Sequence, residues 1–293
     1  MTRFLIIGAS SFTGSHFCEY LAQQQISYAT CSLRVLNFSS APECIINFAA
    51  LNVVAPSWEH PHDYMRVNVD MTLSIFEYLR DHPYTKYVHI STPEVYGSTE
   101  SNNISEDAPF NPSTPYAVSR AAAEMMLQCY AKQYGFPVAI TRGCNVYGPG
   151  QQLYRLIPKL IATIKKGEKF QLEGGGQSRR AFLHVSDMVS AIYKVAMAGV
   201  GVYHISPLEG LRTIKAVAEI VCAQMCVLPD YVLVAHPQRP GQDQAYDLDS
   251  TRMRALGWKP TMDFHPGIHT VIDWVDHDWD KLFDQPMKYD FRP

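Results

Sequence analysis

Two short segments of the sequence carry residue types that suit proton transfer. Tyr116 and Arg120 lie four positions apart at the start of a predicted helix, so both side chains share one helical face. A fixed cation beside a phenol stabilises its ionised form, which a proton-transferring tyrosine needs near neutral pH. Thr92 and Glu94 follow the apolar run 87–90 and add a hydroxyl and a carboxylate at a strand end. The four residues predict an acid/base site, against the alternative of a capped surface helix after an ordinary strand.

The elements that position these side chains follow from the alternation of short apolar runs with helical patterns in the first half of the chain. This alternation is typical of an α/β fold with a doubly wound parallel sheet. In such a sheet, ligands bind at the edge formed by the carboxyl ends of the strands. The predicted strands are 4–7, 28–32, 43–48, 87–90, 138–142 and 202–205, and the predicted helices are 13–23, 63–80, one from Tyr116, 156–166 and one from Asp187. The last dozen residues are predicted to be a loosely held tail.

Composition and charge narrow the class of protein. The 293 residues are 47% hydrophobic and 18% charged, and the net charge is −3. Because the sequence has no basic run and no apolar stretch of membrane-spanning length, neither a nucleic-acid nor a membrane partner is expected. A strand and glycine turn at the N-terminus argue against a secretory signal. The seven cysteines, mostly within apolar patterns, favour reduced thiols in a cytoplasmic protein, and no ligand spacing predicts a metal site.

A glycine-containing turn follows the first predicted strand and opens a helix. Glycines at such a junction permit a tight turn and close backbone approach to a pyrophosphate, which rests on the helix N-terminus. The pattern keeps the first and last glycines but has a serine in the middle. The turn is therefore predicted to bind a dinucleotide through Gly8, Ser11, Phe12, Thr13 and Gly14, with a plain strand–helix turn as the alternative.

The end of the second predicted strand bears on the choice of cofactor. The acidic residue that grips the adenosine ribose is absent there, and Ser32 and Arg34 stand in its place. Arg34 is either a receptor for a 2′-phosphate or a solvated loop residue, so NAD and NADP both stay open. Too few residues separate strand 28–32 from strand 43–48 for a helix and a further strand, which predicts a shortened adenine side of the pocket.

Eight motifs occur along the chain in a fixed order: Gly8–Gly14, Asn47–Ala50, Asn68, Ser91–Gly97, Tyr116–Arg120, Arg142–Pro149, Arg180–Val185 and Arg239–Gly241. This is the order found in the extended short-chain dehydrogenases/reductases, and the chain resembles their NAD-dependent epimerase/dehydratase family. Within that family it is most similar to the nucleotide-sugar 4,6-dehydratases, and the match extends to about Trp274.

The resemblance implies a Rossmann-type doubly wound parallel sheet with a smaller C-terminal substrate-binding lobe. The implied dinucleotide-binding domain comprises residues 1–150 and 178–206, and the implied substrate lobe comprises 151–177 and 207–293. Ala49, Ala50, Tyr116 and Arg120 would join the turn in holding the nicotinamide cofactor. A homodimer through a four-helix bundle is expected from helix 63–80 and the helix from Tyr116.

The resemblance also implies a reaction on a hexose attached to a nucleoside diphosphate. Tyr116 would remove the proton of the C4 hydroxyl as hydride passes to the cofactor, while Thr92 holds the 4-oxygen. Glu94 would then take the acidified C5 proton, and the C6 hydroxyl would leave. Three positions match residues that hold the diphosphate: Asn145, Arg180 and Arg239.

Departures from the family pattern keep alternatives open. Pro93 stands where the dehydratases have the aspartic acid that protonates the leaving hydroxyl, and Arg120 replaces the family lysine. A 4,6-dehydratase-like lyase is favoured because Glu94 supplies a base for C5, which a C4 epimerase does not need. The alternatives are a C4 or C5 epimerase, a uronate decarboxylase, and a sugar-nucleotide binder without turnover.

Overall fold

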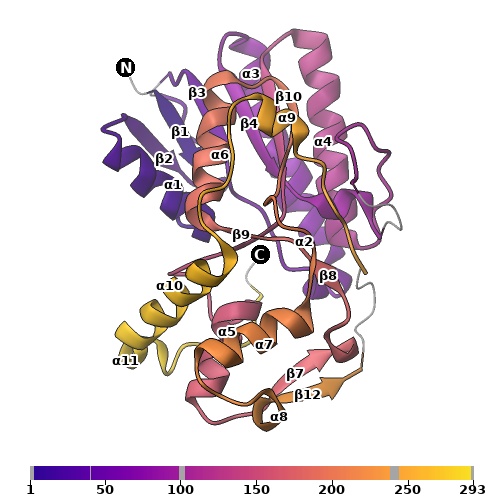
Figure 1. Ribbon diagram of the computed structural model, residues 1–293. Helices are drawn as coiled ribbons and strands as arrows, with labels where there is room; N and C mark the ends of the chain where they lie inside the picture. The colour runs from indigo at the N-terminus through magenta and orange to yellow at the C-terminus, as the bar shows by residue number, and fades with distance from the viewer. Residues whose placement is uncertain (1–2, 40, 99–102, 238–243, 292–293) are drawn as a thin grey trace.

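The fold is built on one parallel sheet. The structure is a computed structural model that describes residues 3–39, 41–98, 103–237 and 244–291. Within these ranges, six parallel strands pair in the order β10-β5-β4-β3-β1-β2 (Figure 1). Their bounds are β1 Phe4–Ile7, β2 Tyr28–Cys31, β3 Cys44–Asn47, β4 Lys86–Ser91, β5 Val138–Gly143 and β10 Gly201–Ile205. The predicted doubly wound α/β sheet is confirmed.

Helices cover both faces of this sheet. On one face α1 (Phe12–Gln23) and α6 (Val185–Ala198) pack through a core that includes Phe17 and Val88. On the other face α3 (Met71–Asp81) and α4 (Pro115–Tyr134) pack through a second core that includes Tyr87 and Leu127. Adjacent residues of β4 thus point to opposite faces, as the alternation of side chains along a strand requires.

The sheet ends at β2, as the short spacing in the sequence predicts. Residues after β2 form a small bridge between Ser32 and Val35, and the chain returns to β3 on the other side of β1. In the described part of this connection, residues 32–39 and 41–43, no helix forms. The sheet edge beside the glycine turn is therefore short.

A second, smaller lobe has its own apolar core. The helices α5 (Leu156–Lys165), α7 (Ile214–Gln224) and α10 (Phe264–His277) enclose it beside the parallel pair β7 (Phe170–Glu173) and β12 (Leu233–His236). Figure 1 shows this lobe below the sheet. Shorter elements include β6 Asn145–Tyr147, β8 Arg179–Arg180, β9 Phe182–His184, β11 Arg212–Thr213, α8 Pro229–Val232, α9 Thr251–Ala255, α11 Trp279–Leu282, and the 3-10 turns η1 Ala55–Trp58 and η4 Gly174–Gly176.

The chain crosses between the two parts more than once. Met253 and Trp258, in the stretch 207–293 assigned to the substrate lobe, pack into the core between α6 and the sheet. The domain boundaries stay a prediction. No helix in the described ranges has both the length and the apolar character that crossing a membrane requires.

One local expectation needs refinement and another was wrong. The predicted helix 63–80 is helical throughout, but it is divided into α2 (Pro61–Met65), a π-helical turn η2 (Arg66–Asp70) and α3. The C-terminal tail is not loose as far as it is described, because the ring of Phe291 stacks on His60 with the centroids 4.0 Å apart. The stacking partner of Phe291 is far away in the sequence, so the local sequence pattern of the tail gives no signal of this contact.

Candidate active site

The carboxyl end of β4 carries two of the predicted catalytic side chains. Thr92 follows the strand in extended conformation, and its hydroxyl accepts a hydrogen bond from the backbone N–H of Glu94 at 3.3 Å. It thereby caps the short 3-10 helix η3 (Pro93–Tyr96), with Pro93 at the first helical position. Pro93 is thus explained locally by helix initiation, and Glu94 stands on the first turn at the sheet edge.

The start of α4 brings the third side chain to the same place. Thr114 caps the helix by accepting from the N–H of Ala117 at 3.1 Å, and Pro115 occupies the first turn. Tyr116 follows at once, close enough to Thr92 for the hydroxyl of Thr92 to lower the pKa of the phenol. The structure therefore brings Thr92 and Tyr116 together, with the carboxylate of Glu94 close enough to act electrostatically on the phenol.

The pKa of Tyr116 is raised, although the neighbouring cation was expected to lower it. Burial raises the pKa of Tyr116 above its ordinary value, and Glu94 raises it further. Arg120, the Thr92 hydroxyl and Arg155 each lower the pKa, as expected of a cation or a hydrogen-bond donor, but burial outweighs them. The cation opposes the cost of a buried phenolate without cancelling it.

Arg120 is held inside the protein rather than at its surface. Its side chain is buried, and its Nη2 donates to the carbonyl oxygen of Ile90 and lies 3.2 Å from Nε2 of His89. Its Nε–H is buried and has no hydrogen-bond partner in the part of the chain that the structure describes. Because an unpaired buried donor is costly, this atom fits a site completed by a polar ligand.

A buried ion pair holds the carboxyl end of β4 in place. Arg142 of β5 forms a two-pronged contact with Glu124 of α4, with Nη2 and Oε2 2.6 Å apart, and neither side chain is more than 2% exposed. Ser91, the last residue of β4, donates its hydroxyl to Glu124. Arg142 also donates to the phenol oxygen of Tyr96, the last residue of η3. The pair thus ties together β4, β5, α4 and η3.

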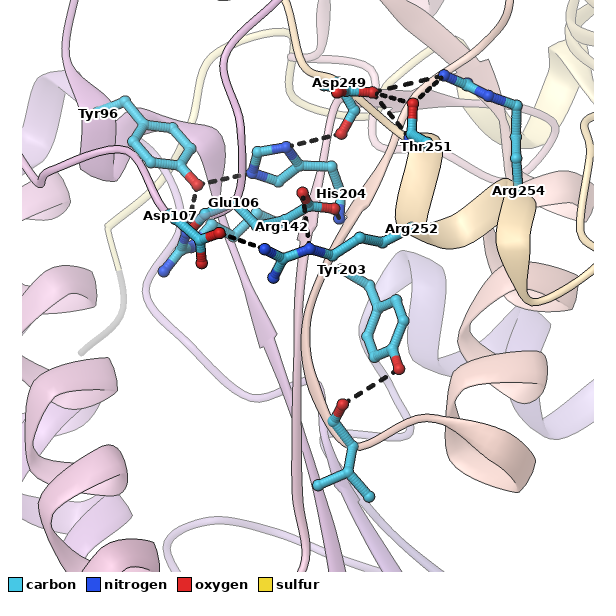
Figure 2. A network of polar contacts seen from close by, with 11 residues as sticks. Tyr96, Glu106, Asp107, Arg142, Tyr203, His204, Asp249, Thr251, Arg252 and Arg254 are labelled. Atoms are coloured by element: carbon cyan, nitrogen blue, oxygen red, sulfur yellow. Dashed lines mark hydrogen bonds and ion pairs between the residues drawn. The ribbon is translucent and has the colours of Figure 1, made fainter.

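Figure 2 shows how this network continues to the C-terminal part of the chain. The phenol of Tyr96 lies 2.6 Å from Nε2 of His204 on β10, and Nδ1 of His204 lies 3.1 Å from the carbonyl oxygen of Asp249. The backbone N–H of His204 donates to Glu106, which also faces Arg252. Through Tyr96 and His204, the segment around Asp249 is thereby linked to η3.

The glycine turn after β1 has the geometry that close backbone contact requires. Gly8 has φ +80°, and a Cβ there would lie 2.7 Å from the backbone nitrogen of Ala49. A Cβ on Gly14 would lie 2.4 Å from the carbonyl oxygen of Gly8. Ser11, the substitute for the middle glycine, caps α1 by accepting from the N–H of Gly14 at 3.2 Å. Both positions therefore require glycine, and the turn leads directly into the N-terminus of α1, an arrangement that fits a dinucleotide.

The other predicted cofactor residues lie along the same edge of the sheet. Phe12 and Thr13 begin α1, and Ala50 follows β3, all three half-buried. Ser32 and Arg34 stand exposed just beyond β2, whose last residue pairs with the last residue of β1. Parallel strands end at one edge, so these positions share it with Thr92.

The predicted diphosphate residues are not gathered by any contact in the described structure. Asn145 begins β6, half-buried, with its N–H donating to Ala181. Arg180 lies on β8, donates to the carbonyl oxygen of Gln244 at 3.3 Å, and sits over the ring of Tyr246. Arg239 lies outside the described residues.

Three further side chains frame Tyr116, and only Asn68 was among the residues that the sequence analysis singled out. Arg155, in the loop before α5, donates to Asn52 at 2.7 Å and lowers the pKa of Tyr116. The ring of Tyr64 meets that of Tyr116 edge-on with centroids 6.2 Å apart. Asn68, in the π-helical turn, donates to Ser119 at 2.9 Å and pairs with the backbone of residue 51.

Comparison with known proteins places this site in a family. The sequence profile of the NAD dependent epimerase/dehydratase family matches residues 4–205. The human dTDP-D-glucose 4,6-dehydratase is 32% identical over 250 residues, which cover 81% of this chain and 70% of that protein. The chain belongs to the NAD dependent epimerase/dehydratase family. The dTDP-glucose 4,6-dehydratase of Streptomyces niveus is 34% identical over 236 residues, with 79% and 69% covered.

Solved structures of the epimerase/dehydratase family superpose on nearly the whole chain. The dTDP-glucose 4,6-dehydratase of Streptomyces venezuelae, solved with NAD, has 26% identity and a TM-score of 0.88, covering 96% of this chain and 98% of its own. The UDP-glucose 4-epimerase of Thermus thermophilus, also solved with NAD, has 26% identity and a TM-score of 0.86, covering 94% and 99%. The predicted family and the Rossmann-type fold are confirmed, and the relatives are nucleotide-sugar dehydratases and epimerases.

Proposed function

We propose that this protein is an NAD-dependent lyase that removes water from a nucleoside-diphosphate hexose, in the manner of a 4,6-dehydratase. The observation that carries the proposal is the contact between Thr92 and Tyr116, with Glu94 beside them, at the same sheet edge as the glycine turn. The family's dehydratases and its NAD-bound structures support it.

The chain's own groups supply the proton transfers of this reaction. The phenolate of Tyr116 takes the proton of the C4 hydroxyl, and the hydroxyl of Thr92 holds the oxygen of that group. When bound, the nicotinamide supplies a hydride acceptor and donor for the sugar. The ketone at C4 acidifies the hydrogen at C5, and the carboxylate of Glu94 is the base that removes it. The C6 hydroxyl leaves as the C5–C6 double bond forms.

The leaving hydroxyl needs a proton that residue 93 does not give. Pro93 has no titratable group and serves to begin η3. The proton therefore comes from another group or from water, and this chain differs from its relatives at that step. The buried position of Thr92 and Tyr116 keeps bulk water from the reacting carbons.

The remaining groups hold the two ligands. We assign the cofactor to the residues around the glycine turn and the loop after β3, completed by Tyr116 and Arg120. The absence of an acid after β2 and the exposure of Arg34 leave room for a phosphate on the adenosine ribose, so NADP is the second cofactor to test. Asn145, Arg180 and Arg239 are the proposed contacts of the diphosphate.

Assembly and location complete the proposal. Exposed apolar side chains gather on α2 and α4, between 36% and 57% exposed: Met65, Val118, Met125 and Met126. Such a face on two neighbouring helices suits a homodimer through a four-helix bundle, and we place the protein in the cytoplasm. Light scattering at micromolar concentration is expected to give the mass of two chains. A single-chain mass would contradict the dimer.

The test of function uses the purified full chain with NAD and a panel of UDP-, dTDP-, CDP- and GDP-hexoses in heavy water. Mass spectrometry is expected to show loss of one water from one of them, and Tyr116→Phe and Glu94→Gln are expected to slow that loss strongly. Exchange of the C5 hydrogen without loss of water would instead establish a C5 epimerase. Inversion at C4 without loss of water or C5 exchange would establish a C4 epimerase, the activity named for the Thermus thermophilus neighbour. Binding of the nucleotide without any change in the sugar would contradict both.

A further inference from the structure

A continuous chain of buried polar side chains runs beneath the site, from the cofactor loop to Arg120. Asn47, the last residue of β3, accepts from the N–H of Ala49 at 2.9 Å and donates to the phenol oxygen of Tyr87 at 3.2 Å. That oxygen lies 3.1 Å from Nδ1 of His89, and Nε2 of His89 lies 3.2 Å from Nη2 of Arg120. The four side chains from Asn47 to Arg120 are each at most 3% exposed.

The hydrogen bonds in this chain determine where the proton of His89 lies. A guanidinium has donors and no acceptor, so Nε2 of His89 must accept from Arg120 with its lone pair. The ring proton therefore lies on Nδ1, which donates to the oxygen of Tyr87. That oxygen accepts from both His89 and Asn47. Burial together with the charges of Arg120 and Arg142 holds the pKa of His89 well below its usual range, which agrees with a neutral ring.

Because Nε2 of His89 accepts a hydrogen bond, it helps to orient the guanidinium of Arg120. Nη2 of Arg120 is held by two acceptors, Nε2 of His89 and the carbonyl oxygen of Ile90. With one nitrogen fixed in this way, the planar guanidinium has a single orientation, one helical turn from Tyr116. A lysine at position 120 would be a compact charge without this planar constraint.

We propose that His89 is a positioning residue for this reaction: it holds the guanidinium of Arg120 beside Tyr116 and links it through Tyr87 and Asn47 to the cofactor loop at Ala49. This rests on the proposed role of Tyr116 as the proton acceptor. His89 is thus more than a hydrogen-bonded core histidine, because its partner is the cation of the site.

The first test reads the proton position in the wild-type protein and needs no turnover. In the full chain labelled with ¹⁵N-histidine, NMR is expected to show His89 as the neutral Nδ1–H tautomer across neutral pH. In Arg120→Met the constraint on Nε2 is gone, so the tautomer ratio of His89 is expected to shift. The Nε2–H tautomer or a protonated ring in the wild-type protein would overturn the proposal. Failure of the proposed function would leave this result intact.

The second test is the pH profile of kcat/KM. Tyr116 is faced by Glu94 and Thr92 after β4 and by Arg120 on its own helix. Tyr64 on α2 and Arg155 before α5 complete its surroundings. Freeing the cation in a His89→Leu variant weakens its hold on the phenolate, so the ascending limb is expected to move to higher pH by about half to one unit. Below the limb, this corresponds to about a three- to tenfold loss, which recovers at alkaline pH.

Matched variants separate positioning from loss of packing. Val88→Ala removes buried atoms from the neighbouring position of β4, on the opposite face, and is expected to lower stability without moving the limb. In an Arg120→Met background, His89→Leu is expected to add no further shift. An equal shift in Val88→Ala, or an undiminished one in the Arg120→Met background, would overturn the proposal. If His89→Leu does not fold, Tyr87→Phe is expected to move the limb in the same direction.

Discussion

Removing one partner of the buried Glu124–Arg142 pair is expected to destabilise the protein strongly. In Glu124→Leu the guanidinium of Arg142 keeps its contacts with Tyr96 and with the backbone of residue 106, but loses its counter-charge. Both charged side chains are at most 2% exposed, so water does not replace the carboxylate. An uncompensated buried charge of this kind costs about 3–5 kcal/mol. For 293 residues this corresponds to a fall in Tm of about 5–8 °C.

The assay is thermal unfolding followed by circular dichroism, with urea titration as a second measure of the free energy of unfolding. The double variant Glu124→Leu/Arg142→Met removes both charges and is expected to be more stable than Glu124→Leu alone. Asp63→Asn breaks the exposed pair with Arg66 and is expected to change stability by less than about 1 kcal/mol. A change in Glu124→Leu as small as that in Asp63→Asn would refute the reasoning that this ion pair is buried and fixes the strand end.

Four further outcomes follow from the structure. Because the carboxylate of Glu94 raises the pKa of Tyr116, Glu94→Gln is expected to move the ascending limb of the pH profile of NAD reduction to lower pH, as measured by stopped-flow absorbance. Loss of the base for C5 is expected to slow water loss about 100-fold or more, as measured by mass spectrometry. Burial lowers the pKa of His204 to about 3, so the unfolded state binds more protons below about pH 6.5. His204 should therefore lower the free energy of unfolding by up to about 1.4 kcal/mol for each unit by which the pH falls. Urea titrations at pH 7 and 5 should show a smaller difference in the free energy of unfolding for His204→Gln than for the wild-type protein. Gly14→Ala is expected to weaken NAD binding at least about tenfold by equilibrium dialysis, because the new methyl would lie 2.4 Å from a carbonyl oxygen of the turn. Phe291→Ala is expected to lower stability by about 1–2 kcal/mol in a thermal melt, since it removes a ring stacked in the core beside Tyr116, and an unchanged Tm would contradict that packing.

The fold could be predicted from the sequence wherever one local signal determined one element. β1 was predicted with its observed bounds because Phe4–Ile7 is an uninterrupted apolar run that ends at a glycine turn. The shortness of the connection after β2 followed from chain length, since the stretch before Cys44 is too short for a helix and a strand. Both inferences use only covalent reach and alternation, which a single sequence contains.

The site was only partly predictable, because some of its contacts join segments far apart in the chain. The pairing of Thr92 with Tyr116 was expected, since the family's motifs place both at the same edge. Arg155 and Phe291 reach the surroundings of Tyr116 from distant loops, and nothing in their local sequence announces the contact. The direction of the Tyr116 pKa was misjudged, because burial is a property of the packed molecule and the sequence shows only the neighbouring cation.

The central claim is that Thr92, Glu94 and Tyr116 converge on one hexose ring beside a nicotinamide. A crystal structure of the full chain soaked with NAD and the hexose nucleotide that the mass-spectrometric panel identifies tests it most directly. The account predicts the C4 oxygen of the sugar within hydrogen-bonding distance of both Tyr116 and Thr92, with C5 facing the carboxylate of Glu94. A sugar bound elsewhere, or Glu94 turned toward a different environment, would contradict it.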